Sequence, residues 1–173
     1  MRFLLLPALA TCVVGLTTAP SAQAQSRIGV INFQRAVLDT AEFKKAYADL
    51  EAKFKPRQDA LAKAQQDLQD IETQLRASQG QLSSQGTAEL QARGQRKQVE
   101  VTRLNDDLQE EFTKERDAAV QLTATRMGEV LKKLAEEVQV DAFLDLQSVP
   151  YRKDALDFTD KAVAAYNTAH PVK

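Results

Sequence analysis

Apolar residues recur at heptad spacing through the first half of a long central stretch, residues 41–138. Every seventh position from 47 to 82 holds an aromatic residue or leucine: Tyr47, Phe54, Leu61, Leu68, Leu75 and Leu82. Phe43, Leu50, Ala64 and Ile71 fill most of the positions four residues earlier. The residues between them are mainly charged or amides, so the apolar stripe is narrow. This pattern predicts a coiled-coil-like helix, which must bury its stripe against a partner.

That partner is predicted to be a second helix of the same chain. A Gly- and Ser-rich segment at 78–87 interrupts the heptads and is typical of an exposed hairpin tip. From Thr87 to Val138 apolar residues return at spacings of three and four, which predicts the second helix. We therefore expect residues 41–138 to form an antiparallel hairpin, with Phe54 near Phe112 and Leu75 near Leu90.

Two features bear on the first helix of this hairpin. Asp39 and Glu42 have the spacing of a capping box, which predicts a helix start near Thr40. Pro56 lies inside the predicted helix and removes a backbone donor, so it predicts a bend. Two interpretations of Pro56 stay open: a hinge that lets the arm bend, or a tolerated kink.

Short strands are predicted on both sides of the hairpin. Residues 27–33 are β-branched and apolar, which indicates a buried strand. Residues 140–146 and 149–151 predict two more strands, joined by a turn at Gln147 and Ser148, before a final helix at 158–168 with Ala162 and Tyr166 facing inward. Residues 25–40 and 139–173 thus form a small α/β body with too little chain for a core of its own. We expect its strands to pair between chains, through Ile28, Val30, Ile31, Phe143, Leu144, Leu146 and Tyr151.

The first 24 residues have the pattern of a secretory signal peptide. A positive start at Arg2 precedes an apolar run, and an Ala-x-Ala pattern ends at Ala24, so we expect cleavage near that residue. A permanent membrane anchor is the alternative. Cys12, which lies in this segment, is the chain's one cysteine, so the exported chain would hold no disulfide.

The sequence carries no pattern typical of an enzyme. It lacks G-x-S-x-G, H-E-x-x-H and a Gly-rich phosphate loop, and its one histidine, His170, lies in a polar tail. We therefore expect no catalysis, no cofactor and no metal site. Export and a net charge of −1 argue against a nucleic-acid partner.

Charge is uneven along the predicted hairpin. Residues 73–105 carry a balance of +3 from Arg76, Arg93, Arg96, Lys97 and Arg103 against two glutamates, whereas residues 106–117 carry −4. One interpretation is a positive tip that contacts clients or, weakly, an anionic membrane surface. The other is a solvated helix surface on which these charges cluster by chance.

Taken in order, the strand at 27–32, the long hairpin, the segment 141–146, the turn to Tyr151 and the closing helix resemble the Skp/OmpH family of periplasmic chaperones. The resemblance implies an α+β fold in which a long helical hairpin is inserted in a small strand-containing trimerisation body. It also implies a homotrimer in the periplasm that holds unfolded outer-membrane proteins between its arms without ATP. The better-known members are strongly basic, whereas this chain has a pI of about 5.9, so the resemblance does not by itself imply their lipopolysaccharide or phospholipid contacts.

Two other functions fit the same pattern. The chain could be an exported coiled-coil adaptor that binds one folded partner of the cell envelope, or a peripheral lipid-binding protein. The Gly/Ser-rich free tip and the strands that bracket the hairpin favour the chaperone, because a spacer needs neither.

Overall fold

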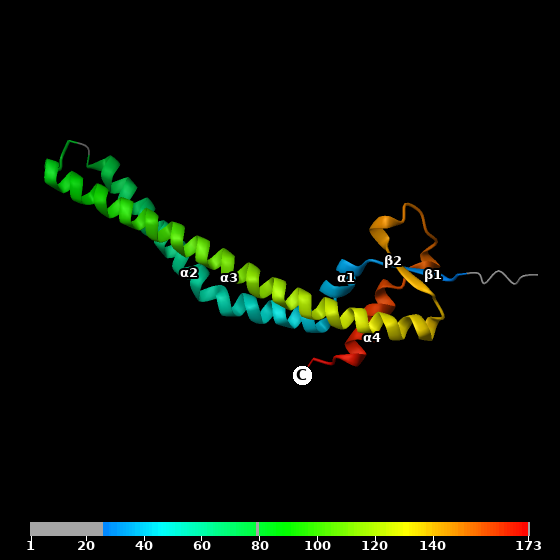
Figure 1. The fold of residues 1–173 in the computed structure, drawn as a ribbon. Coiled ribbons are helices and arrows are strands. Elements are labelled where there is room, and N and C mark those ends of the chain that lie inside the picture. The colour runs from blue at the N-terminus through cyan, green and yellow to red at the C-terminus, as the bar shows by residue number, and fades with distance from the viewer. Residues whose placement is uncertain (1–25, 79, 173) are drawn as a thin grey trace, which may run out of the picture.

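The computed structural model describes residues 26–78 and 80–172. The predicted signal peptide, with Cys12 and the expected cleavage near Ala24, lies outside these residues. The described chain is an α+β fold in which a long helical hairpin projects from a small body, as predicted (Figure 1). We call residues 41–77 together with 84–122 the arm, and residues 26–40 together with 123–172 the body.

The hairpin consists of α2 (Ala41–Ala77) and α3 (Ser84–Val138). Thr40 caps α2, because its side chain accepts a hydrogen bond from the backbone N–H of Phe43. The helix thus begins where the sequence predicts, although the cap is Thr40 and not Asp39. Ser83 caps α3 in the same way by accepting from Gly86. At about 1.5 Å per residue, α2 is roughly 55 Å long.

The seam between α2 and α3 follows the heptads. Phe43, Leu50, Phe54, Ala64 and Ile71 are the buried residues of α2. The rings of Phe54 and Phe112 meet edge to face with their centroids 5.5 Å apart, which confirms the predicted pairing of these two positions. Burial of this apolar stripe is what holds two otherwise polar helices together.

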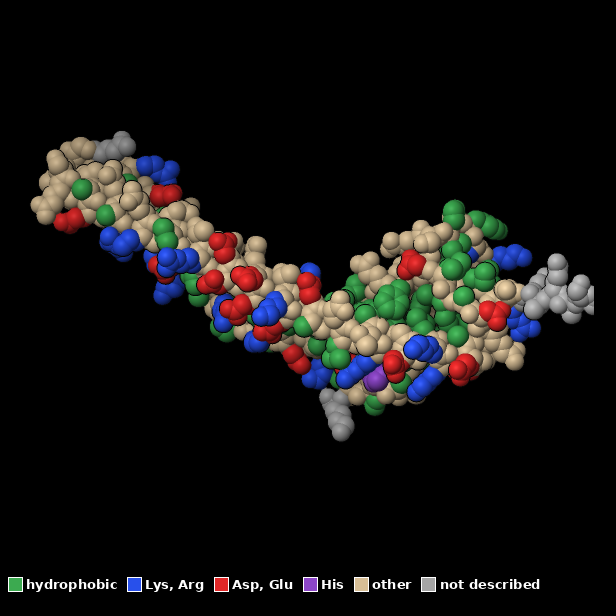
Figure 2. Space-filling model, in the orientation of Figure 1, with side chains coloured by type: hydrophobic (Ala, Val, Ile, Leu, Met, Phe, Trp, Pro, Cys, Tyr) green, Lys and Arg blue, Asp and Glu red, His purple; other side chains and the backbone are tan. Residues whose placement is uncertain are grey.

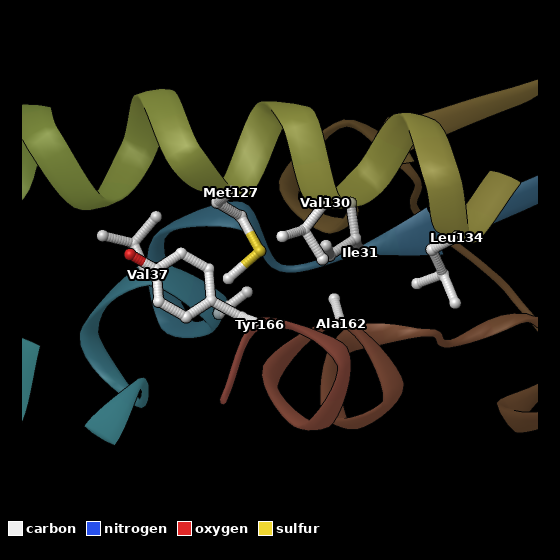
Figure 3. Packing of buried hydrophobic residues seen from close by; sticks show 8 residues of the cluster. Ile31, Val37, Met127, Val130, Leu134, Ala162 and Tyr166 are labelled. Carbon is white, nitrogen blue, oxygen red and sulfur yellow. The ribbon is translucent and has the colours of Figure 1, made fainter. Parts of the chain in front are cut away.

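The core of the chain lies in the body, where four elements meet (Figure 3). These are β1 (Ile28–Ile31), α1 (Phe33–Leu38), the last turns of α3, and α4 (Thr159–Ala169). The buried cluster is formed by Ile31, Ala36, Val37, Met127, Val130, Leu134, Ala162 and Tyr166. The flanking segments 26–40 and 139–172 do not form this core alone, because three of its residues come from α3, which the sequence analysis assigned to the arm. The last turns of α3 pack into the body and complete its core.

Two strands form the sheet, β1 and β2 (Ala142–Asp145), and they run parallel from Ile28↔Ala142 to Ile31↔Asp145. Gly29 permits this pairing, because a Cβ there would come within 2.6 Å of the Phe143 ring. The entire hairpin is the connection between the two parallel strands. β1 thus pairs with β2 of its own chain. The expected pairing of strands between chains stays a prediction.

The predicted strand at 149–151 is absent from the described chain. Asp145 accepts a hydrogen bond from the Gln147 N–H, and a 3₁₀ turn at Leu146–Ser148 follows β2 directly. The other edge of β1 is occupied by the segment before α4, since the Phe158 N–H donates to the Val30 carbonyl. A second 3₁₀ turn lies at Asp154–Leu156. The Val149 N–H donates to the Leu146 carbonyl, so the segment after β2 makes local turn bonds in place of a strand pairing.

Candidate functional site

An apolar hollow lies where the arm joins the body. Its lining comes from three helices, with Phe33, Val37 and Leu38 on α1, Phe43 and Tyr47 on α2, and Val120 and Ala124 on α3. The hollow has a volume of about 630 Å³, and Gln34, Arg116 and Asp117 supply its polar groups. Figure 2 shows hydrophobic side chains gathered on the body, whereas the arm presents mostly polar and charged ones. This composition suits apolar side chains of another polypeptide better than a charged ligand.

The predicted oligomerisation residues divide into buried and accessible ones. Val30 and Ile31 are each only 3% exposed and serve the chain's own core, so their side chains do not reach a surface. Phe143 and Leu146 are half-buried, and the Phe143 ring packs against Phe158. The accessible ones are Ile28, Leu144 and, most fully, Tyr151, which is 83% exposed.

The base of the arm is tied to α4 by a small polar cluster that the sequence analysis missed. Glu42, in the first turn of α2, accepts a hydrogen bond from the hydroxyl of Tyr166 and forms an ion pair with Arg126 of α3. The Tyr166 ring is fully buried, and its centroid lies 4.8 Å from the centroid of the His170 ring. One residue from each of three helices thus meets at the joint between arm and body. The sequence predicted that Tyr166 faces inward. It gave no signal for Glu42 and Arg126, which lie 124 and 40 positions earlier in the chain.

Ionisation in this cluster follows from burial and hydrogen bonding. Burial by itself would raise the pKa of Glu42, but the hydrogen bonds from Tyr166 and Arg126 outweigh it and lower that pKa below its ordinary value. Burial, reinforced by the bond to Glu42, raises the pKa of Tyr166 to about 12. The cluster therefore stays a carboxylate, a neutral phenol and a guanidinium across the neutral pH range.

Pro56 lies inside α2, which is continuous through it. Contacts across the hairpin hold the helix on both sides of this proline. Lys53 pairs with Glu115 at 2.5 Å, Arg57 pairs with Glu111 at 2.5 Å, and both cations lie over the Phe54 ring. A hinge at Pro56 stays a prediction, and bending there would have to break these contacts.

The predicted positive tip is partly neutralised by the neighbouring helix. Lys97 pairs with Asp67 at 3.3 Å and with Glu100 at 2.8 Å, and the hydrogen bond to Glu100 is the main cause that raises its pKa. Residues 60–72 of α2 lie alongside this part of α3 and carry one lysine against three acidic residues, so the local balance falls from +3 to +1. Arg76, Arg93, Arg96 and Arg103 are exposed along the arm. At 77–88, the tip itself has no charged residue.

The described residues, 26–78 and 80–172, hold no candidate metal site. Within those ranges no group of three or more His, Cys, Asp or Glu side chains is placed to hold a metal ion. None of the helices described there combines the length and the apolar character needed to cross a bilayer. The candidate functional surfaces are the hollow, the exposed apolar residues of the body and the faces of the arm.

Comparison with known proteins agrees with this architecture. The model of a family described as outer membrane protein (OmpH-like) matches residues 27–166. A crystal structure from Caulobacter crescentus CB15, described as a candidate outer membrane chaperone (OmpH-like), superposes with a TM-score of 0.67 at 19% identity. The match covers 87% of this chain and 89% of that one. No curated protein sequence matches the chain.

Proposed function

Because the chain belongs to the OmpH-like outer membrane protein family, we propose that it is an ATP-independent holdase chaperone of the periplasm. It binds unfolded outer-membrane β-barrel proteins and prevents their aggregation during transit. The observation that carries the proposal is the arm: two long helices that stand free of the body, with their own stripe buried and most other residues exposed. Such an arm presents a large surface without closing on a specific pocket.

Holding an unfolded chain calls for many weak contacts around an enclosed volume. Several arms that surround one client provide this, since linked weak contacts give high avidity while each one exchanges quickly. At roughly 55 Å, an arm is long enough to span a small domain. The proposed arrangement is a homotrimer whose three arms enclose the client.

The body carries the features expected of the trimer contact. Ile28, Leu144, Tyr151 and Leu156 are apolar, lie on β1, β2 and the following loop, and are each at least 40% exposed. Grouped apolar residues on a protein surface commonly mark an interface between chains. With Val30 and Ile31 committed to the core, we assign the contact to Ile28, Leu144 and Tyr151 among the residues that the sequence suggested.

An aggregation assay tests the proposal. A urea-unfolded porin is diluted into buffer with the chain and without nucleotide, and light scattering is followed over time. An unrelated coiled-coil protein at the same concentration is the control. The chaperone suppresses scattering and the control does not. Equal scattering in both samples would remove the chaperone function, and capture of a single folded envelope protein would support an adaptor in its place.

A further inference from the structure

One face of the arm is built from uncharged hydrogen-bonding side chains. On α3 they recur at alternating steps of four and three residues: Gln91, Gln95, Gln98, Thr102, Asn105 and Gln109. This spacing places them on one side of a helix. All but Asn105, which is half-buried, are exposed. We call these six residues the amide row.

Residues of α2 continue this face across the seam. Gln58 borders a shallow hollow together with Leu108, Gln109 and Phe112. Nearer the tip, Leu68 and Leu75 border a second hollow with Gln91, Gln95 and Gln98. The amides thus surround apolar side chains of the seam, and Val99, which is 51% exposed, adds another apolar contact beside the row. Glu72 alone carries a charge among the described residues that line these two hollows.

Two of the ion pairs that join α2 to α3 within the arm lie on the other side of the seam. Lys53, Ala60, Asp67 and Gln74 form one row of α2 at heptad spacing, and Gln58, Gln65 and Glu72 form another. These rows correspond to the g and e positions, which flank the seam on opposite sides. Lys53 and Asp67 make ion pairs with Glu115 and Lys97 of α3. This charged side therefore ties the two helices together, whereas no ion pair between α2 and α3 is found on the amide side among the described residues.

Among the described residues, no side-chain amide of the row makes a hydrogen bond within the chain, whereas the Thr102 hydroxyl donates to the Gln98 carbonyl. Gln66 and Gln85, elsewhere on the arm, each donate to a carboxylate four residues further on. The four glutamines of the row instead have Gln, Val or Thr at that position. Each side-chain amide offers two donors and an acceptor, which match the N–H and C=O groups of an extended backbone.

We propose that the amide row and the two hollows are the surface on which the arm holds extended segments of an unfolded client. The amides bind the client's backbone, which is the same in every sequence, and the hollows receive its apolar side chains. A neutral face neither repels nor selects clients of either charge. This inference rests on the proposed chaperone function and names the working face of the arm.

Charge substitutions in matched positions test the assignment. Gln98→Glu with Gln109→Glu, and Gln98→Lys with Gln109→Lys, place two like charges on the amide face. Ala60→Glu with Gln74→Glu is the control, because both residues are exposed and lie in the row of Lys53 and Asp67. Affinity for an unfolded porin is measured by fluorescence titration of the full chain, after circular dichroism has verified the helix content of each variant.

The double Glu variant and the double Lys variant, which we call the face variants, are expected to bind the unfolded porin about tenfold more weakly than the wild type. Charges of either sign must then be buried against the client. The control binds within about twofold of the wild type. Gln98→Ala with Gln109→Ala, which keeps the helix and adds no charge, also weakens binding. Unchanged affinity in the face variants, or opposite effects of Glu and Lys, would overturn the assignment.

Two further outcomes are distinguishable. If the wild type holds the porin but the face variants alter only self-association in sedimentation, the amide face is a contact between copies of this chain and the inference is wrong. If the wild type itself does not bind unfolded porin, the chaperone function fails together with the inference.

Discussion

Replacing Tyr166 with Phe tests the joint between arm and body most sharply. The substitution removes only the hydroxyl and leaves the fully buried ring in place. Glu42 then loses its hydrogen bond from α4 and keeps its ion pair with Arg126. Hydrogen bonds to charged groups contribute about 1.5–3 kcal/mol. The Glu42 side chain is 27% exposed, so water replaces part of the lost hydrogen bond. We therefore expect the free energy of unfolding to fall by an amount near the lower limit, about 1.5 kcal/mol.

The assay is urea unfolding followed by far-ultraviolet circular dichroism at one fixed chain concentration. Tyr47→Phe is the control, because it removes a hydroxyl from a half-buried tyrosine that is not part of the cluster of Glu42, Arg126 and Tyr166. It should leave the free energy of unfolding nearly unchanged. A double-mutant cycle with Glu42→Gln then shows whether the two side chains act on each other.

The pH dependence gives this prediction a second readout. The folded state lowers the pKa of Glu42 from 4.5, so its contribution is present above that pH and is lost as the pH falls through the folded value. The folded state raises the pKa of Tyr166 from 10.0 to about 12, so its contribution is present below pH 10.0 and is lost as the pH rises through that interval. The stability difference between wild type and Tyr166→Phe should therefore shrink at both extremes. Equal stability of the two proteins at neutral pH would refute the reasoning.

Other substitutions test the packing of body and arm. Gly29→Ala forces a methyl group against the Phe143 ring and should destabilise the body by about 1–3 kcal/mol, measured by urea unfolding; unchanged stability would show that the ring moves freely. Phe54→Ala removes the ring that meets Phe112 edge to face and should lower the stability of the arm by about 3 kcal/mol. The expected result is faster hydrogen exchange in the arm, with exchange in the body unchanged. Gly128→Ala should stabilise α3 by up to about 1 kcal/mol, because nothing lies within 4 Å of the added Cβ; a lower melting temperature would contradict this.

The hairpin was predictable because its signals are local and repeated. Heptad spacing identified the buried face of α2, and the Gly/Ser segment identified the hairpin turn. Counting residues back from that turn placed Phe54 opposite Phe112. Each of these depends on residues near one another in sequence. The amide row was also visible at helical spacing, but which side of the seam it occupies became clear only when its hollows and the ion pairs were located.

The body was harder to predict because its contacts join distant parts of the chain. The parallel pairing of β1 with β2 spans the whole hairpin, and a count of residues in the flanking segments omitted Met127, Val130 and Leu134, which complete the core. The strand expected at 149–151 had the right composition, but the Val149 N–H is used in a local turn after β2. Glu42, Arg126 and Tyr166 are ordinary residues in the sequence, and only their meeting in space gives them a role.

The central claim is that three chains enclose one unfolded client between their arms. Sedimentation equilibrium of the chain, alone and with an unfolded porin in the absence of nucleotide, tests it most directly. The account predicts the mass of three chains without client, and the mass of three chains and one porin with it. A monomer that forms no complex with the unfolded porin would contradict the account.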